Sequence, residues 1–145
     1  MSNEEISNYD EEGNIIYTKY SNGEERWYDE KGNCTHYKYA TGYEIIYDYD
    51  EKGCISYSKN SEGYETWRDY DERGNCIHLR DSSLSTPYNT LNGFINKHFE
   101  YWCDYDDKDN EIHYRDSDGY ERWTDYDKNG LLCHYKDSDG FEDWS

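Results

Sequence analysis

The sequence predicts an all-β fold in which tandem antiparallel hairpins form an elongated, twisted meander sheet. The first observation behind this prediction is a Tyr-Asp dipeptide that recurs about every 21 residues along the chain. The second is composition, because 19 Tyr and 5 Trp stand against one Ala and 11 Gly in 145 residues. Aromatic residues suit a pleated surface, whereas such a composition disfavours a helical bundle. We therefore expect burial of aromatic rings to supply most of the hydrophobic stabilisation of the fold.

Six Tyr-Asp dipeptides mark six repeat units. The spacings between them are 19, 21, 21, 35 and 21 residues, so the first unit lacks two residues and the fourth carries 14 more. The dipeptides are Tyr9-Asp10, Tyr28-Asp29, Tyr49-Asp50, Tyr70-Asp71, Tyr105-Asp106 and Tyr126-Asp127. We expect one repeat domain over 1–145, with a cap at 1–8, repeats at 9–82 and 99–145, and an insertion at 83–98.

Each unit contains two turn signals. A full unit reads Tyr-Asp-x-x-Gly-Asn, an alternating stretch, a polar turn ending in Gly, and then Tyr-Glu-x-Trp-x-Asp. Turns such as 71–75 and 116–119 place Gly after polar residues, as hairpin turns with positive φ require. Two turns per unit predict two short strands per unit, or roughly eleven or twelve strands in all.

Side-chain alternation predicts which residues share a face of the sheet. On the first strand of each unit, an apolar column is expected to form the core face. Its members are Ile15 and Tyr17, Thr35 and Tyr37, Ile55 and Tyr57, Ile77 and Leu79, Ile112 and Tyr114, and Cys133 and Tyr135. The opposite face is expected to carry Cys34, His36 and Lys38, and their equivalents Cys76, His78 and Arg80.

Three further columns repeat along the chain. One histidine position recurs at His36, His78, His113 and His134, on the face of Lys38, Arg80, Arg115 and Lys136. On the second strand, Glu precedes Trp by two residues at Trp27, Trp67, Trp102, Trp123 and Trp144. In one unit Ile46 replaces the Trp, and acids follow two residues after this position at Asp48, Asp69, Asp104 and Asp125. The Trp column is interpreted as packed rings, and the alternative is a set of grooves for a cation.

The Tyr-Asp-x-x-Gly-Asn element over residues 9–145 resembles the YD repeats of Rhs-type bacterial proteins, here as a short, stand-alone version. The resemblance implies a β-hairpin array and a bacterial or phage origin. It transfers no catalytic residue. Two features depart from the family: the chain is much smaller than the shells those repeats build around toxins, and it holds no evident toxin or protease segment.

Residues 82–99 differ in character from the rest of the chain. They contain no acid, and Lys97 is their only Lys or Arg. An apolar stripe with spacings of 4, 3 and 4 predicts a short helix capped by Thr86 and begun by Pro87, whereas Asn92-Gly93 favours a hairpin instead. The stripe is Leu84, Tyr88, Leu91 and Ile95. Functionally the segment is either a partner-binding element or a lid over the sheet.

No pattern of catalytic or ligand-binding residues stands out above the repeat. The five cysteines are never spaced Cys-x-x-Cys, and we interpret them as small apolar side chains with reduced thiols. The half EF-hand motif at 125–130 has Lys136 where a bidentate Glu is required. We therefore predict a non-enzymatic protein with no cofactor and no metal.

The chain has no run of 18 apolar residues and no signal-peptide pattern, so we expect no membrane partner and a cytoplasmic location in a bacterium or phage-infected host.

Charge narrows the class of partner. The chain carries 34 Asp and Glu against 15 Lys and Arg, for a net charge of -19. In residues 105–125, eight acids and three bases leave -5. Over two strands this is about one negative charge per 2 Å, close to the ~1.7 Å of duplex DNA. Direct binding to nucleic acid is disfavoured, and binding to a basic protein that itself binds nucleic acid is favoured.

The leading hypothesis is an intracellular inhibitor or immunity-type protein that covers the basic surface of a nuclease, toxin or CRISPR-type effector by charge mimicry. The predicted partner-binding residues are Asp104, Asp106, Asp107, Asp109, Glu111, Asp116, Asp118, Glu121, Asp125, Tyr88, Leu91, Phe94, Trp102 and Trp123. The alternative is an aromatic-rich adhesive module that binds cell wall or a cationic ligand. A third interpretation is that the acids only keep an aromatic repeat soluble. The oligomeric state stays open.

Overall fold

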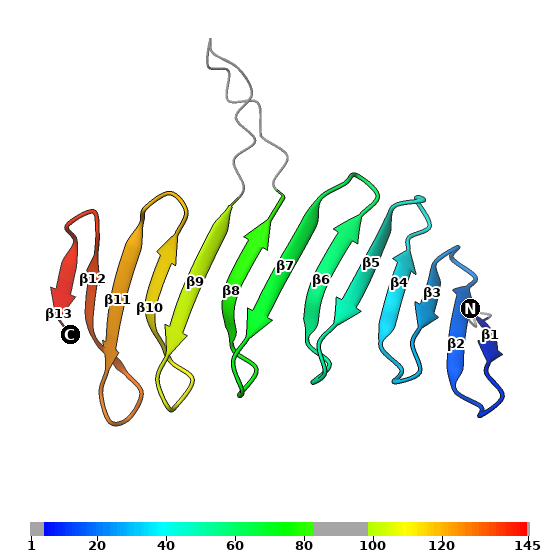
Figure 1. The fold of residues 1–145 in the computed structure, drawn as a ribbon, viewed down its shortest axis with the longest axis horizontal. Coiled ribbons are helices and arrows are strands. Elements are labelled where there is room, and N and C mark those ends of the chain that lie inside the picture. The colour runs from blue at the N-terminus through cyan, green and yellow to red at the C-terminus, as the bar shows by residue number, and fades with distance from the viewer. Residues whose placement is uncertain (1–4, 83–98, 145) are drawn as a thin grey trace, which may run out of the picture. The chain divides into compact units, whose positions relative to one another are not determined.

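Antiparallel β-strands form all the regular structure in the computed structural model, which describes residues 5–82 and 99–144 (Figure 1). The predicted helix or hairpin at 83–98 lies outside the described residues. The chain divides into two compact units, an N-terminal unit of residues 1–65 and a C-terminal unit of residues 66–145. No helix of the described ranges has the length and hydropathy needed to cross a membrane.

Neighbouring strands in each unit follow one another in sequence order and pair antiparallel, as the repeat predicts. The first six strands are β1 Glu5–Tyr9, β2 Ile15–Tyr20, β3 Glu25–Tyr28, β4 Cys34–Lys38, β5 Glu44–Tyr49 and β6 Ile55–Asn60. The other seven are β7 Glu65–Tyr70, β8 Cys76–Asp81, β9 Glu100–Tyr105, β10 Glu111–Asp116, β11 Glu121–Tyr126, β12 Leu132–Asp137 and β13 Glu142–Trp144. The all-β prediction is confirmed, with residues 5–9 supplying one strand beyond the expected number.

The Tyr-Asp dipeptide begins the first turn of each unit, and the first, second and fourth units carry the complete Tyr-Asp-x-x-Gly-Asn motif. In residues 71–75, Asp71 Oδ1 accepts hydrogen bonds from the backbone N–H of Arg73 and of Asn75, both at 2.9 Å. Asp71 Oδ2 accepts a third from the Asn75 side-chain amide at 3.0 Å. Gly74 has a φ of 95° in this turn. Each motif residue thus has a physical role. The Asp side chain accepts hydrogen bonds, the Gly adopts the left-handed backbone conformation, and the Asn side chain donates a hydrogen bond to the Asp.

A β-bulge follows this turn and changes the side-chain alternation. Cys34 lies opposite Tyr28 and Tyr37 lies opposite Arg26, so Thr35 is an additional residue between the two ladder segments. Equivalent register shifts occur between β1 and β2, β5 and β6, β7 and β8, β9 and β10, and β11 and β12. Because opposite residues share a face, Cys34 lies on the face of Tyr37, and His36 lies on the other face.

The predicted core column is wrong in its side-chain faces because of these bulges. Tyr17 lies opposite Trp27, which also lies opposite His36, so Tyr17 lies on the histidine side of the sheet. Tyr57 lies on that side as well, opposite Asp48. The placement of Cys34 and Cys76 with the histidines is wrong for the same reason.

The described residues form no closed apolar core on either face. Among the described residues, Cys103 at 5% exposure is the only buried apolar side chain. The other buried residues are polar: Thr18, Thr66, Asp81 and Thr124. The rings pack on their neighbours while remaining partly exposed, as in the Tyr101–Tyr114 pair with centroids 5.5 Å apart. Each unit is stabilised by backbone pairing and by side-chain contacts within each face.

Candidate functional site

The candidate site is the side of the C-terminal unit that carries its histidines, here called the histidine face. The strand register brings the sequence columns of Trp, His, acids and bases together on it. Its members are Trp67, Asp69, His78, Arg80, Glu100, Trp102, Asp104, His113, Arg115, Glu121, Trp123, Asp125, His134, Lys136, Glu142 and Trp144.

Histidine and tryptophan rings stack across three successive hairpins of this face. Their register partners are fixed by the ladders β8–β9, β10–β11 and β12–β13. The pairs are His78–Trp102 at 5.1 Å and 7°, His113–Trp123 at 5.3 Å and 11°, and His134–Trp144 at 3.7 Å and 16°. Repetition of one pair type means that the face presents the same chemistry at regular intervals.

Carboxylates hold these imidazole rings. His134 lies between Asp125, 2.8 Å from Nδ1, and Glu142, 3.0 Å from Nε2. Both hydrogen bonds raise the pKa of His134 above its usual value, and the one with Asp125 has the larger effect. Each neighbouring carboxylate thus favours the positively charged form of the ring.

The other two histidines of the face differ at one ring nitrogen. His78 also lies between two acids, with Asp69 2.9 Å from Nδ1 and Glu100 2.7 Å from Nε2. His113 has Asp104 3.1 Å from Nδ1, but its Nε2 is buried without a hydrogen-bond partner in the part of the chain that the structure describes.

Two arginines stack on two of the tryptophans. The Arg80 guanidinium lies 4.4 Å from the ring centroid of Trp67, and that of Arg115 lies 4.8 Å from Trp102. Guanidinium groups stack readily on indole because they are planar and weakly hydrated. The face therefore already contains cation–aromatic contacts made by the chain itself.

Five of the predicted partner-binding residues come together on this face: Asp104, Glu121, Asp125, Trp102 and Trp123. Asp104 and Asp125 have side chains 72% and 69% exposed, although each contacts a histidine. Because their carboxylates are mostly exposed, a second group is able to approach them from solvent.

Six other predicted residues within the described ranges lie off this face, so the described members of the set do not form one surface. Glu111 lies on the opposite face, where it accepts hydrogen bonds from Arg122 at 2.6 and 2.9 Å. The turns at 106–110 and 116–119 hold Asp106, Asp107, Asp109, Asp116 and Asp118. Tyr88, Leu91 and Phe94 lie outside the described residues.

Alternation along one strand does not predict the stacks between the histidine and tryptophan columns or the role of Arg80 and Arg115. Both columns are evident in the sequence, but their relative position depends on the register across each hairpin. The sequence does contain a signal for this position. Counted from the Gly of Tyr-Asp-x-x-Gly, or from Asp109 where it replaces that Gly, position +4 is Tyr or His and position +6 is Lys or Arg in all six units. This count is independent of the bulge.

Burial raises the pKa of the Cys34 and Cys103 thiols, so neither is activated. Burial, the largest effect, and the nearby Glu111 raise the pKa of Cys103 to about 12, so this thiol stays protonated at neutral pH. All five cysteines are free. Within residues 5–82 and 99–144, no three His, Cys, Asp or Glu side chains converge as metal ligands would.

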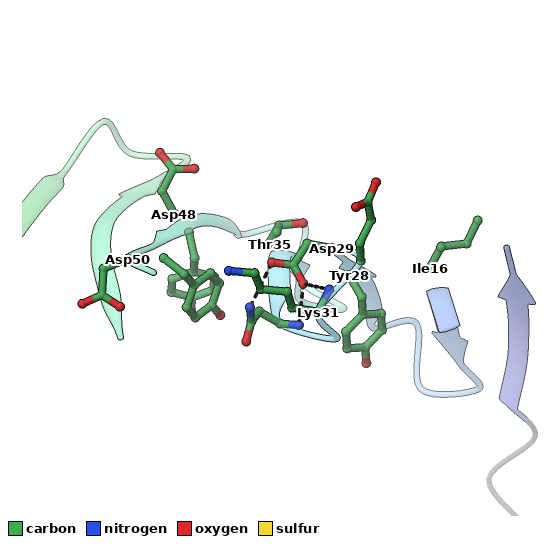
Figure 2. Close-up of a pocket in the computed structure, with 11 residues that line it drawn as sticks. Ile16, Tyr28, Asp29, Lys31, Thr35, Asp48 and Asp50 are labelled. Carbon is green, nitrogen blue, oxygen red and sulfur yellow. Dashed lines mark hydrogen bonds between the residues drawn. The ribbon is translucent and has the colours of Figure 1, made fainter. Parts of the chain in front are cut away.

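The N-terminal unit has an open hollow of about 700 Å³ on its bulged strands (Figure 2). Tyr28, Tyr47 and Tyr49 line it together with several acids. Asp29 is engaged in its own turn, accepting hydrogen bonds from the Lys31 and Asn33 backbone at 2.9 and 2.8 Å. Lys31 lies in the same hollow, so it already contains a cation.

The described strands define a class of fold, a tandem antiparallel β-hairpin repeat. Two solved structures support this fold. One is a chain of the Photorhabdus luminescens Tc holotoxin pore, with a TM-score of 0.59 and 14% identity over 95% of this chain. The other comes from the TcdB2-TccC3-Cdc42 crystal structure, with a TM-score of 0.52 and 17% identity over 92% of this chain.

This chain covers only 9% of the length of each of those two chains. No family model matches the sequence, and no curated protein matches it. The likeness therefore concerns the β-repeat fold.

Proposed function

We propose that this protein is a non-enzymatic acidic binding protein of bacterial or phage origin, built from YD-type repeats. Its partner is the basic surface with which a nuclease, toxin or CRISPR-type effector holds nucleic acid. By covering that surface inside the cell, it acts as an inhibitor or immunity-type protein.

The observation that carries the proposal is the row of exposed carboxylates on the histidine face. Asp69, Asp104 and Asp125 have side chains 72%, 72% and 69% exposed. They lie on alternate strands, so neighbours in the row are separated by about 9.6 Å. That interval is close to the rise of three base pairs along the axis of duplex DNA, about 10 Å.

The charge balance of the C-terminal unit supports the same partner. Its described residues include 19 acids and 8 Lys or Arg, which leave -11. A field of this sign steers a cationic surface towards the unit and repels nucleic acid. The half-exposed tryptophans between the acids add contact area of the kind that dominates protein interfaces.

The test is capture of partners on the immobilised protein from bacterial lysate at low and high salt, followed by elution with a duplex oligonucleotide. We expect a basic nucleic-acid-binding enzyme that salt releases, that DNA displaces, and whose activity the purified protein inhibits. Retention on wall polymer or choline resin without such an enzyme would favour the adhesive alternative.

A pair of matched triple variants tests the site. D69N/D104N/D125N removes three charges from the histidine face, and we expect it to weaken partner binding by roughly tenfold or more. D107N/D139N/D143N removes the same charge from two turns and the opposite face. Equal loss in both variants would mean that total charge decides binding and that the histidine face is not the site.

A further inference from the structure

The histidine face contains a three-layer arrangement in which an indole lies between an imidazole and a guanidinium. The complete example is Trp102, which has His78 stacked at 5.1 Å and the Arg115 guanidinium 4.8 Å away. The two partners come from opposite neighbouring strands, because Trp102 pairs with His78 on β8 and with Arg115 on β10. They therefore approach the ring from its two sides.

The next unit contains the same arrangement with one layer missing. His113 stacks on Trp123 at 5.3 Å, as His78 does on Trp102. The ladder places Lys136 opposite Trp123, in the position that Arg115 has opposite Trp102. Lys136 is exposed, and among the described residues it makes neither a cation–aromatic contact nor an ion pair. Trp123 is correspondingly 38% exposed.

Carboxylates border this open indole. Glu121 and Asp125 lie two residues before and two residues after Trp123 on β11, so all three side chains project from one face. The Asp125 side chain is 69% exposed. A cation placed over the Trp123 ring would thus have an acid on each side along the strand.

We propose that Trp123 is the receptor for an arginine side chain of the partner, which completes the layer that Arg115 supplies at Trp102. The inference rests on the proposed function, since it names the residue type by which a basic partner would be recognised. Arginine is favoured over lysine because the face itself stacks guanidinium groups on Trp67 and Trp102, whereas Lys136 leaves Trp123 uncovered.

The experiment is an NMR titration of the Trp Nε1–H signals at low ionic strength with N-acetyl-arginine amide, and with N-acetyl-lysine amide as a probe of equal charge. The Trp123 signal is assigned by its absence in W123F. We expect the arginine probe to shift this signal and to bind roughly threefold more tightly than the lysine probe.

Two conservative substitutions make the test sharper. In K136R the chain fills the position with its own guanidinium. The affinity for the arginine probe, measured from the Trp123 signal, should therefore fall at least about fivefold. In R115K the Trp102 position opens, and the Trp102 signal should begin to respond. Both changes keep the charge and leave the strand pairing intact.

The inference is overturned if Trp123 responds equally to both probes, if it does not respond, or if K136R binds the arginine probe as the unmodified protein does. Each of these results leaves the proposed function standing as long as basic enzymes still bind through the carboxylate row. Failure of every basic enzyme to bind would instead remove the proposed function.

Discussion

At the residue scale, Gly74 and Asp109 occupy equivalent turn positions with positive φ. Gly74 has a φ of 95°, and Asp109 is the one non-glycine described residue with positive φ, at 65°. Asp tolerates this region better than most residues. Asp109 also gains an ion pair with Arg73 at 3.1 Å and accepts a hydrogen bond from Asn75 at 2.8 Å. These contacts offset the conformational cost.

Replacing Gly74 by Ala isolates that cost. A Cβ built at Gly74 meets no atom within 4 Å, so the change introduces no clash and only disfavours the backbone conformation. We expect G74A to lower the free energy of unfolding in urea by about 1–2 kcal/mol, and G74N to lower it by less. Equal stability of G74A and the unmodified protein would show that the turn adopts another conformation.

His134 gives a prediction about pH. Hydrogen bonds with Asp125 first and then Glu142 raise the pKa of His134 in the folded state. Its contribution to stability is therefore fully present below the unfolded pKa of about 6.5 and is lost as pH rises through the higher folded value. NMR titration of the His134 ring should give a pKa above that of an unstructured peptide, and D125N should reduce the difference. A folded pKa at or below the peptide value would contradict the geometry.

At the scale of elements, the strands and turns were predictable and the side-chain faces were only partly so. The Asp, Gly and Asn of the turn each act locally, so the sequence pattern indicates them directly. The bulge residue, such as Thr35, adds one position after the turn, and strict alternation then assigns Tyr17 and Tyr57 to the wrong face. The Trp–His stacks depend on pairing between strands, which alternation along one strand does not contain.

The insertion replaces an ordinary hairpin turn. Asp81 N–H donates to the Phe99 carbonyl at 2.9 Å, and the Phe99 N–H donates to the Asp81 side chain at 3.3 Å. The same backbone bond closes Asp116–Tyr120 and Asp137–Phe141, each at 3.0 Å. The paired strands β8 and β9 thus end as the uninterrupted hairpins do.

We therefore expect residues 82–98 to be replaceable by the Ser-Asp-Gly of 117–119. The free energy of unfolding should change by no more than about 1 kcal/mol, because loop-closure entropy varies slowly with loop length and the closing pair is retained. Urea unfolding and hydrogen exchange of the Asp81 amide would measure this. Loss of cooperative unfolding would show that the segment stabilises the sheet. If the fold persists while partner binding is lost, the segment belongs to the binding surface.

At the scale of the whole molecule, net charge opposes folding. The 34 acids exceed the 15 Lys and Arg by 19, so the negative charges cannot be neutralised one to one within the chain. Exposed ion pairs such as Lys19–Glu25 at 3.1 Å add little stability individually. Repulsion among the unpaired acids is therefore expected to exceed the attraction within the pairs when salt is low.

Salt should consequently stabilise this protein. Raising NaCl from about 10 mM to about 150 mM shortens the screening length from roughly 30 Å to roughly 8 Å, which weakens repulsion between distant acids more than attraction between contacting pairs. We expect the urea midpoint to rise over this range. In D107N/D139N/D143N, which lacks three acids without ion pairs in the described structure, the low-salt midpoint should be higher and the salt dependence smaller. A urea midpoint that falls as NaCl rises would mean that attraction within the ion pairs exceeds repulsion among the excess acids. The main role of the acids would then be to stabilise the fold.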